Sequence, residues 1–136
     1  MSLKDCIIHH IGYVTKSIDH TADSFKIMGY SKGVKVFDPI QNVNICFIKK
    51  HGSVTIELVE PADERSSVNK MLKNMGGVSP YHICYQVHDV DVAYNELVDN
   101  EGFTPLFRPV EATAMDNKLI CYLYKREIGY IELVNE

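Results

Sequence analysis

The sequence lacks the features that would assign it to nucleic acid, to a membrane or to a zinc ribbon. Lysines and arginines form no cluster, and the net charge of −4 over 136 residues gives no support for nucleic-acid binding. No apolar stretch approaches the roughly 20 residues that span a bilayer. The cysteines form no CxxC pair, which excludes a zinc ribbon. We therefore expect neither a nucleic-acid nor a membrane partner.

The cysteines are few and far apart. Cys6, Cys46, Cys84 and Cys121 lie in apolar, strand-like stretches, as reduced core thiols do. Residues 1–5 lack the apolar core of a signal peptide. Both observations favour a cytoplasmic protein, and the chain length suits one domain.

The chain contains an internal repeat. Residues 45–59 align without a gap with residues 120–134 at an offset of 75, and both stretches end in Ile-Glu-Leu-Val. Upstream, residues 10–13 overlay residues 82–85 at an offset of 72. Two copies of a module can meet about a pseudo-two-fold axis, where equivalent side chains converge. The equivalent polar residues are predicted to form one metal site: His10, Glu57, His82 and Glu132.

Each copy reads as a strand, a helix and then further strands. In the first copy we expect strands at 7–14, 33–37, 43–49 and 53–59, with a helix between Ser17 and Gly29. In the second we expect strands at 81–87, 104–108, 119–124 and 129–134, with a helix between Asp89 and Gly102. The prediction is one domain over 1–136, with module one at 7–60, a tether containing a short helix at 61–78, and module two at 79–136.

Strand alternation places each candidate glutamate on the face opposite its apolar neighbours. A carboxylate on a half-buried face is costly unless it is paired or bound to a metal. A single glutamate of this kind would be expected to face solvent. Because the glutamate and a histidine both recur at equivalent positions of the two copies, a metal site is favoured instead. Imidazole and carboxylate suit Ni, Co, Mn, Fe or Zn. His9 precedes His10, but the overlay with His82 selects His10, and we expect His20, His51 and His88 to be solvated.

The order His, Glu, His, Glu in tandem modules resembles the vicinal-oxygen-chelate superfamily, which includes glyoxalase I, extradiol dioxygenases and bleomycin-resistance proteins. The chain is most similar to methylmalonyl-CoA epimerases, on Glu60-Pro61, the Ser66-Ser67-Val68 helix start, and Gly76-Gly77 shortly before His82-Ile83-Cys84. The resemblance implies an α+β fold in which two tandem βαβββ modules form a U-shaped mixed sheet around a cleft. It also implies one divalent metal ion, a small-molecule substrate and a homodimer.

In that family the metal holds a thioester carbonyl, and two carboxylates exchange the proton of the adjacent carbon. The resemblance makes Glu132 a metal ligand and a catalytic base. The slot of the second base is Ile40, which cannot move a proton, and Asp38 is displaced from it by two residues. The loop at 112–117 lacks the glycines common in epimerases.

Three functions follow from the resemblance. The first is an epimerase-like enzyme acting on an acyl-CoA or related thioester through a stabilised enolate. The second is a glyoxalase-I-type lactoylglutathione lyase, which acts on a hemithioacetal and needs only one base, so that Ile40 matters less. The third is a non-catalytic, resistance-type protein that binds a small molecule, although many of those proteins lack the four ligands retained here.

Overall fold

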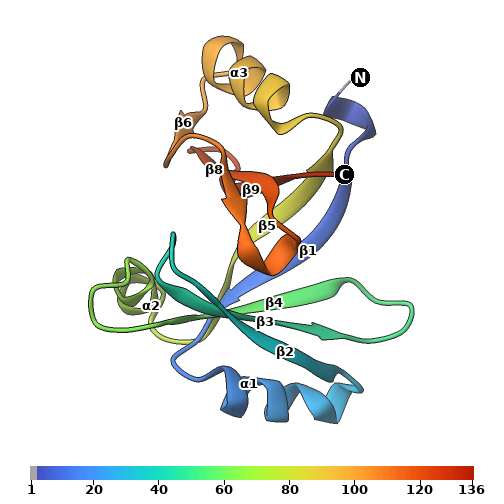
Figure 1. Cartoon of the computed structure of the whole chain (residues 1–136), viewed down its shortest axis with the longest axis vertical. Coiled ribbons are helices and arrows are strands. Elements are labelled where there is room, and N and C mark those ends of the chain that lie inside the picture. The colour runs from blue at the N-terminus through green and yellow to red at the C-terminus, as the bar shows by residue number, and fades with distance from the viewer. Residues whose placement is uncertain (1–2) are drawn as a thin grey trace. The chain divides into compact units, whose positions relative to one another are not determined.

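Helices and strands follow the predicted order in the computed structural model, which describes residues 3–136 (Figure 1). The chain divides into two units. The module-one unit is His10–Tyr81, and the module-two unit combines His82–Glu136 with the residues up to His9. The α+β class and the two βαβββ modules are confirmed. The single domain over 1–136 and the U-shaped sheet around a cleft stay predictions.

The module-one unit contains a four-stranded mixed sheet in the order β2-β3-β4-β1. Strand β4 runs parallel to β1 and antiparallel to β3, which pairs antiparallel with β2. Its elements are β1 (Ile7–Val14, which belongs to this unit from His10 on), α1 (Ile18–Phe25), the 3-10 turn η2 (Lys26–Met28), β2 (Ser31–Asp38), β3 (Val43–Lys49), β4 (Thr55–Pro61) and α2 (Val68–Met75).

Helix α1 covers one face of this sheet (Figure 1). Ile18 and Ala22 of the helix pack against Ile48, Ile56 and Leu58 of the strands, and all five are buried. The predicted alternation in β4 is confirmed, because Ile56 and Leu58 face this core while Glu57 has the opposite orientation along the strand.

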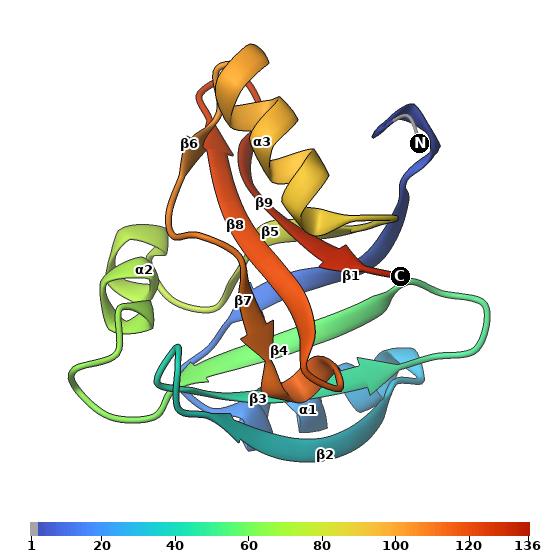
Figure 2. The same cartoon turned by 45° about the horizontal axis from the view of Figure 1, so that its top comes forward.

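The module-two unit repeats the plan, with β9 parallel to β5 and antiparallel to β8. Helix α3 lies across β8 and β9 (Figure 2), and its residues Val90, Ala93 and Leu97 pack against Leu123 and Leu133. The elements are η1 (Leu3–Asp5), β5 (Ser79–Val87), α3 (Val90–Asn100), β6 (Thr104–Pro105), β7 (Val110–Ala112), η3 (Thr113–Met115), β8 (Lys118–Lys125) and β9 (Gly129–Asn135).

The strand predicted at 104–108 is wrong in extent. It ends after Pro105, and a second short strand, β7, begins after Pro109; both fragments pair with β8. Proline has no N–H to donate to a ladder, so two prolines four residues apart interrupt the strand. The strand predicted at 33–37 is longer, as β2 over Ser31–Asp38, and the strand predicted at 53–59 begins and ends two residues later, as β4.

The predicted helix ends are confirmed. Ser17 and Asp89 cap α1 and α3 with nearly identical backbone angles, φ −145° and ψ 108° against φ −144° and ψ 108°. Each side chain accepts a hydrogen bond from the backbone N–H three residues on. Gly29 follows η2 in the left-handed region at φ 88°, where a side chain would be strained.

Neither a membrane-spanning helix nor a disulfide was expected from the sequence, and residues 3–136 bear on both expectations. In this part of the chain, no helix has the length and apolar character needed to cross a bilayer. The four cysteines form no disulfide within these residues, and Cys46, Cys84 and Cys121 are buried, in agreement with their prediction as core residues.

We predict that Asp89→Ala lowers the free energy of unfolding by about 0.5–2 kcal/mol, because the Val92 N–H loses its cap. Urea unfolding followed by circular dichroism measures the change. Asp99→Ala is the control, since Asp99 is an exposed residue of the same helix and its replacement should change stability by less than about 0.5 kcal/mol. Equal losses in both variants would contradict a capping role.

Candidate metal centre

The module-two unit buries a histidine beside a glutamate. His82 comes from β5 and Glu132 from the parallel strand β9. His82 Nε2 lies 3.0 Å from Glu132 Oε1, within hydrogen-bonding distance, and the two residues are 3% and 1% exposed. This contact pairs the imidazole Nε2 with one oxygen of the carboxylate away from water.

The module-one unit buries the equivalent pair. His10 of β1 and Glu57 of β4 have 0% and 1% of their side-chain surfaces exposed, and His10 Nε2 lies 3.4 Å from Glu57 Oε1. This separation exceeds that of a usual N–H···O hydrogen bond. The pair is therefore looser than its counterpart in module two.

The two pairs occupy the same place in the strand register. Gly12 lies opposite Glu57 in the parallel pair β1–β4, and Cys84 lies opposite Glu132 in β5–β9. The antiparallel hairpins agree as well, since Phe47 pairs with Glu57 and Tyr122 pairs with Glu132. The sequence offsets of 72 and 75 thus correspond to equivalent register positions in the two modules.

Each histidine also packs against an aromatic ring that the sequence analysis did not single out. The rings of His10 and Phe47 meet edge to face with centroids 5.4 Å apart, and those of His82 and Tyr122 do so at 5.1 Å. Phe107 extends the second cluster, 5.6 Å from Tyr122. The signal was present, because Phe47 and Tyr122 are related by the offset of 75.

The donors in each unit suit a divalent cation. One neutral imidazole nitrogen and one carboxylate oxygen are ligands that Zn, Ni, Co, Mn and Fe accept. Their burial removes competition from bulk water, and a buried carboxylate is stabilised by a cation. Within each unit the predicted histidine and glutamate lie together.

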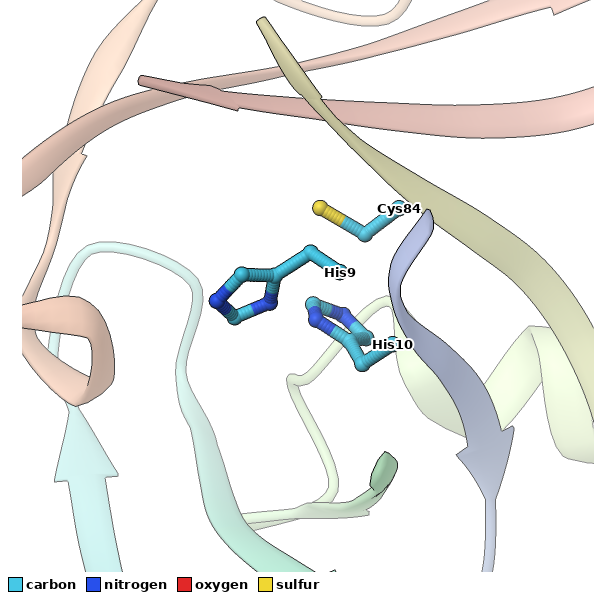
Figure 3. Close-up of side chains that lie close together, drawn as sticks. All are labelled: His9, His10 and Cys84. Atoms are coloured by element: carbon cyan, nitrogen blue, oxygen red, sulfur yellow. The ribbon is translucent and has the colours of Figure 1, made fainter. Parts of the chain in front are cut away.

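A second His-containing cluster lies in the module-two unit. His9 and Cys84 lie close together (Figure 3), with an imidazole nitrogen within 4.8 Å of the thiol sulfur. Figure 3 also draws His10, the next residue along β1. One imidazole and one thiol are fewer donors than the four of a tetrahedral zinc site, so this pair is no metal site by itself.

Two other thiols are poor candidates for ligands. Burial raises the pKa of Cys121 to about 12, and the nearby charge of Glu132 acts in the same direction. Burial likewise raises the pKa of Cys46, against the smaller opposing effect of a hydrogen bond with the backbone of Gly33. Since a metal binds the thiolate, these two cysteines act as apolar core residues.

Asp38, the residue nearest to the missing second base, has a structural role. It is 0% exposed, and its carboxylate accepts hydrogen bonds from Ile40 N at 2.9 Å, from Gln41 N at 3.1 Å and from Gln41 Nε2 at 3.1 Å. These bonds form the turn between β2 and β3. Ile40 itself is 60% exposed in that turn.

The three histidines expected to be solvated are exposed. His20 lies on α1, His51 in the turn after β3, and His88 after β5. The Nδ1 atom of His88 lies 2.6 Å from Glu136 Oε1 at the surface, where an ion pair contributes little.

Comparison with known proteins gives one family and one fold. The sequence matches the Glyoxalase/Bleomycin resistance protein/Dioxygenase superfamily over residues 9–122. No curated protein matches the sequence.

Solved structures share the fold at low identity. Methylmalonyl-CoA epimerase from Mycobacterium tuberculosis is 22% identical, with a TM-score of 0.81 over 94% of this chain and 86% of its own. A hypothetical protein from Bacillus halodurans is 23% identical, with a TM-score of 0.83 over 97% and 95% of the two chains. A variant of Streptomyces coelicolor methylmalonyl-CoA epimerase, in complex with 2-nitronate-propionyl-CoA, is 24% identical, with a TM-score of 0.80 over 95% and 96%.

Proposed function

Because this chain belongs to the glyoxalase/bleomycin resistance protein/dioxygenase superfamily, we propose that it is a divalent-metal-dependent enzyme that stabilises an enolate or enediolate. We propose epimerase-like action on an acyl-CoA or related thioester, the class of molecule bound in the Streptomyces coelicolor structure. The observation that carries the proposal is the occurrence of a buried His–Glu pair at equivalent register positions of both modules.

The metal ligands in this proposal are His10, Glu57, His82 and Glu132. Two imidazoles and two carboxylates would balance the charge of a divalent ion, and a six-coordinate ion would keep open positions for substrate oxygens. Ni, Co, Mn, Fe and Zn all suit this donor set. When bound, the ion would supply Lewis-acid polarisation of the substrate carbonyl.

The chain's own residues would move the proton. Glu132 would accept the proton from the carbon next to the carbonyl and return it. His82 would ligate the ion beside this base, and its Nε2 lies 3.0 Å from Glu132 Oε1. The burial of both residues keeps bulk water from competing for the proton.

A glyoxalase-I-type lyase is the second candidate, and the turn after β2 favours it. Ile40 offers no base, and Asp38 is engaged in three hydrogen bonds. A reaction that shuttles one proton between adjacent carbons of a hemithioacetal needs a single base, which Glu132 could provide. A small-molecule-binding protein of the resistance type is the third candidate, but a binder without turnover has no need of two buried His–Glu pairs.

The cytoplasm remains the predicted compartment, and we propose a homodimer. Strand β2 ends the strand order of the module-one sheet and presents an eight-residue edge. Val34 and Phe37 on this strand are 80% and 52% exposed. An unpaired edge with exposed apolar side chains favours pairing with a second copy.

We predict one divalent ion per chain after reconstitution, measured by elemental analysis. His10→Ala and His82→Ala should each reduce the bound metal strongly, because each removes one donor of a shared ion. His88→Ala is the control, since this histidine is exposed and lies in an ion pair with Glu136. Two ions per chain would mean that each pair binds its own metal, and failure to bind any ion would favour the non-catalytic binder.

We predict that Glu132→Gln reduces exchange of the α-proton for deuterium on a thioester by about 10²–10⁴ while the fold is kept, because an amide is no base. Glu57→Gln is the matched control at the equivalent register position with equal burial. An equally large loss in that variant, at unchanged metal content, would contradict Glu132 as the single base.

We predict further that Ile40→Glu increases turnover of a chiral 2-methyl thioester if the enzyme is an epimerase lacking its second base. A lyase with one shuttling base should gain nothing. The measurement is the loss of optical activity of the thioester. Efficient epimerisation by the unchanged protein would show that another residue already serves as the second base.

For the dimer, sedimentation velocity at micromolar concentration should give the mass of two chains. Val34→Lys should shift the protein toward monomer, because a charge on an exposed strand edge opposes pairing. Ile27→Lys is the control, since Ile27 is 90% exposed but belongs to η2 and not to strand β2. A monomeric natural protein would refute the dimer.

A further inference from the structure

A pocket of about 540 Å³ lies within the module-one unit, away from the His–Glu pair. Its walls come from the segment after β1, from the end of β4 and from α2. They are formed by Lys16, Pro61, Asn69, Leu72, Lys73 and the Gly76–Gly77 pair.

The pocket is cationic in a chain of net charge −4. Lys16 and Lys73 are the charged residues that line it, and neither forms an ion pair within residues 3–136. Lys73 lies in the last turn of α2, where a cation complements the helix dipole. Lys16 belongs to a different segment, so the helix dipole does not explain why both cations border one cavity.

The walls of the pocket are held by hydrogen bonds. Asn69 Nδ2 donates to the carbonyls of Asp63 at 2.8 Å and Ser66 at 3.1 Å, which fixes the loop before α2. Gly77 N donates to the Leu72 carbonyl at 3.0 Å, and Gly76 N donates to that of Lys73 at 3.3 Å. These terminal carbonyls of α2 are thus already engaged, which lessens their repulsion of an anion.

The glycines keep the pocket open. Gly76 and Gly77 have φ of 77° and 123°, and a Cβ on either would meet no atom within 4 Å. At these two positions no side chain fills the pocket, and the backbone of Gly76 and Gly77 forms that part of its wall.

The pocket lies at the carboxyl ends of the strands that carry the module-one ligands. Pro61 ends β4 four residues after Glu57, on the same face by alternation, and Lys16 follows β1 six residues after His10. At about 3.3 Å per residue these separations are about 13 and 20 Å. A molecule reacting beside Glu57 would reach the pocket through an extended arm.

We infer that this lysine pocket, defined by Lys16 and Lys73, binds the phosphate groups at the end of a CoA-type thioester. The inference rests on the proposed function for the position of the acyl group, and it adds the recognition of the tail. Two ammonium groups and an open backbone wall match a multiply charged phosphate ligand.

Isothermal titration with coenzyme A alone tests the inference without any need for catalysis. The double variant Lys16→Gln, Lys73→Gln removes both charges and keeps most of the side-chain length. It should weaken coenzyme A binding about 2- to 30-fold, as expected for the loss of two exposed charge contacts. Added salt should weaken binding to the natural protein more than to the double variant. Lys70→Gln is the control, an exposed lysine of α2 that does not line the pocket.

Deuterium exchange on two thioesters separates this inference from the proposed function. The double variant should have a raised KM for the acyl-CoA and an unchanged KM for the acyl-pantetheine, which lacks the nucleotide phosphates. Equal effects of Lys70→Gln, or coenzyme A affinity independent of both pocket lysines, would overturn the inference. Lysine-dependent coenzyme A binding without exchange on either thioester would keep the inference and reject the proposed activity.

Discussion

The site depends on the register of one parallel strand pair in each module, β1 with β4 and β5 with β9. This register sets Glu57 opposite Gly12 in one unit and Glu132 opposite Cys84 in the other. A slip by one residue would exchange the two faces of the strand. Glu57 would then point into the core formed by Ile56, Leu58 and α1, where a carboxylate has no partner. The apolar packing of each sheet on its helix therefore also fixes the position of the candidate ligands.

The same strands fix where the helices begin. Ile18 N, at the start of α1, donates to Glu60 Oε1 at 2.7 Å, and Val90 N, at the start of α3, donates to Asn135 Oδ1 at 2.7 Å. The two acceptors occupy equivalent positions after the glutamate of each pair. Glu60 uses a carboxylate oxygen and Asn135 an amide oxygen to accept the equivalent hydrogen bond from the first residue of the helix. The position of the acceptor is therefore the same in both modules, although its charge differs.

The sequence predicted the duplicated parts and the tether helix α2, and it missed other features that only one module has. The gap-free overlay at an offset of 75 covers two complete hairpins, so it carries their register and the aromatic partners Phe47 and Tyr122. The prolines at 105 and 109 have no counterpart in module one, and the strand they interrupt was predicted as continuous. The lysine pocket joins segments that are distant in sequence, a relation that no local pattern reveals.

The burial of the carboxylates limits which residues could act as a second base beside Glu132. Among residues 3–136, the buried carboxylates are those of Asp38, Glu57 and Glu132. Asp38 is used by the turn that it forms. Ile40, at the slot of the second base, is exposed and apolar. Any second buried carboxylate acting on the substrate carbon would therefore have to be Glu57, the duplicate of Glu132. One-base chemistry would make the two glutamates unequal despite their equivalent positions; their histidine contacts measure 3.4 Å for His10–Glu57 and 3.0 Å for His82–Glu132.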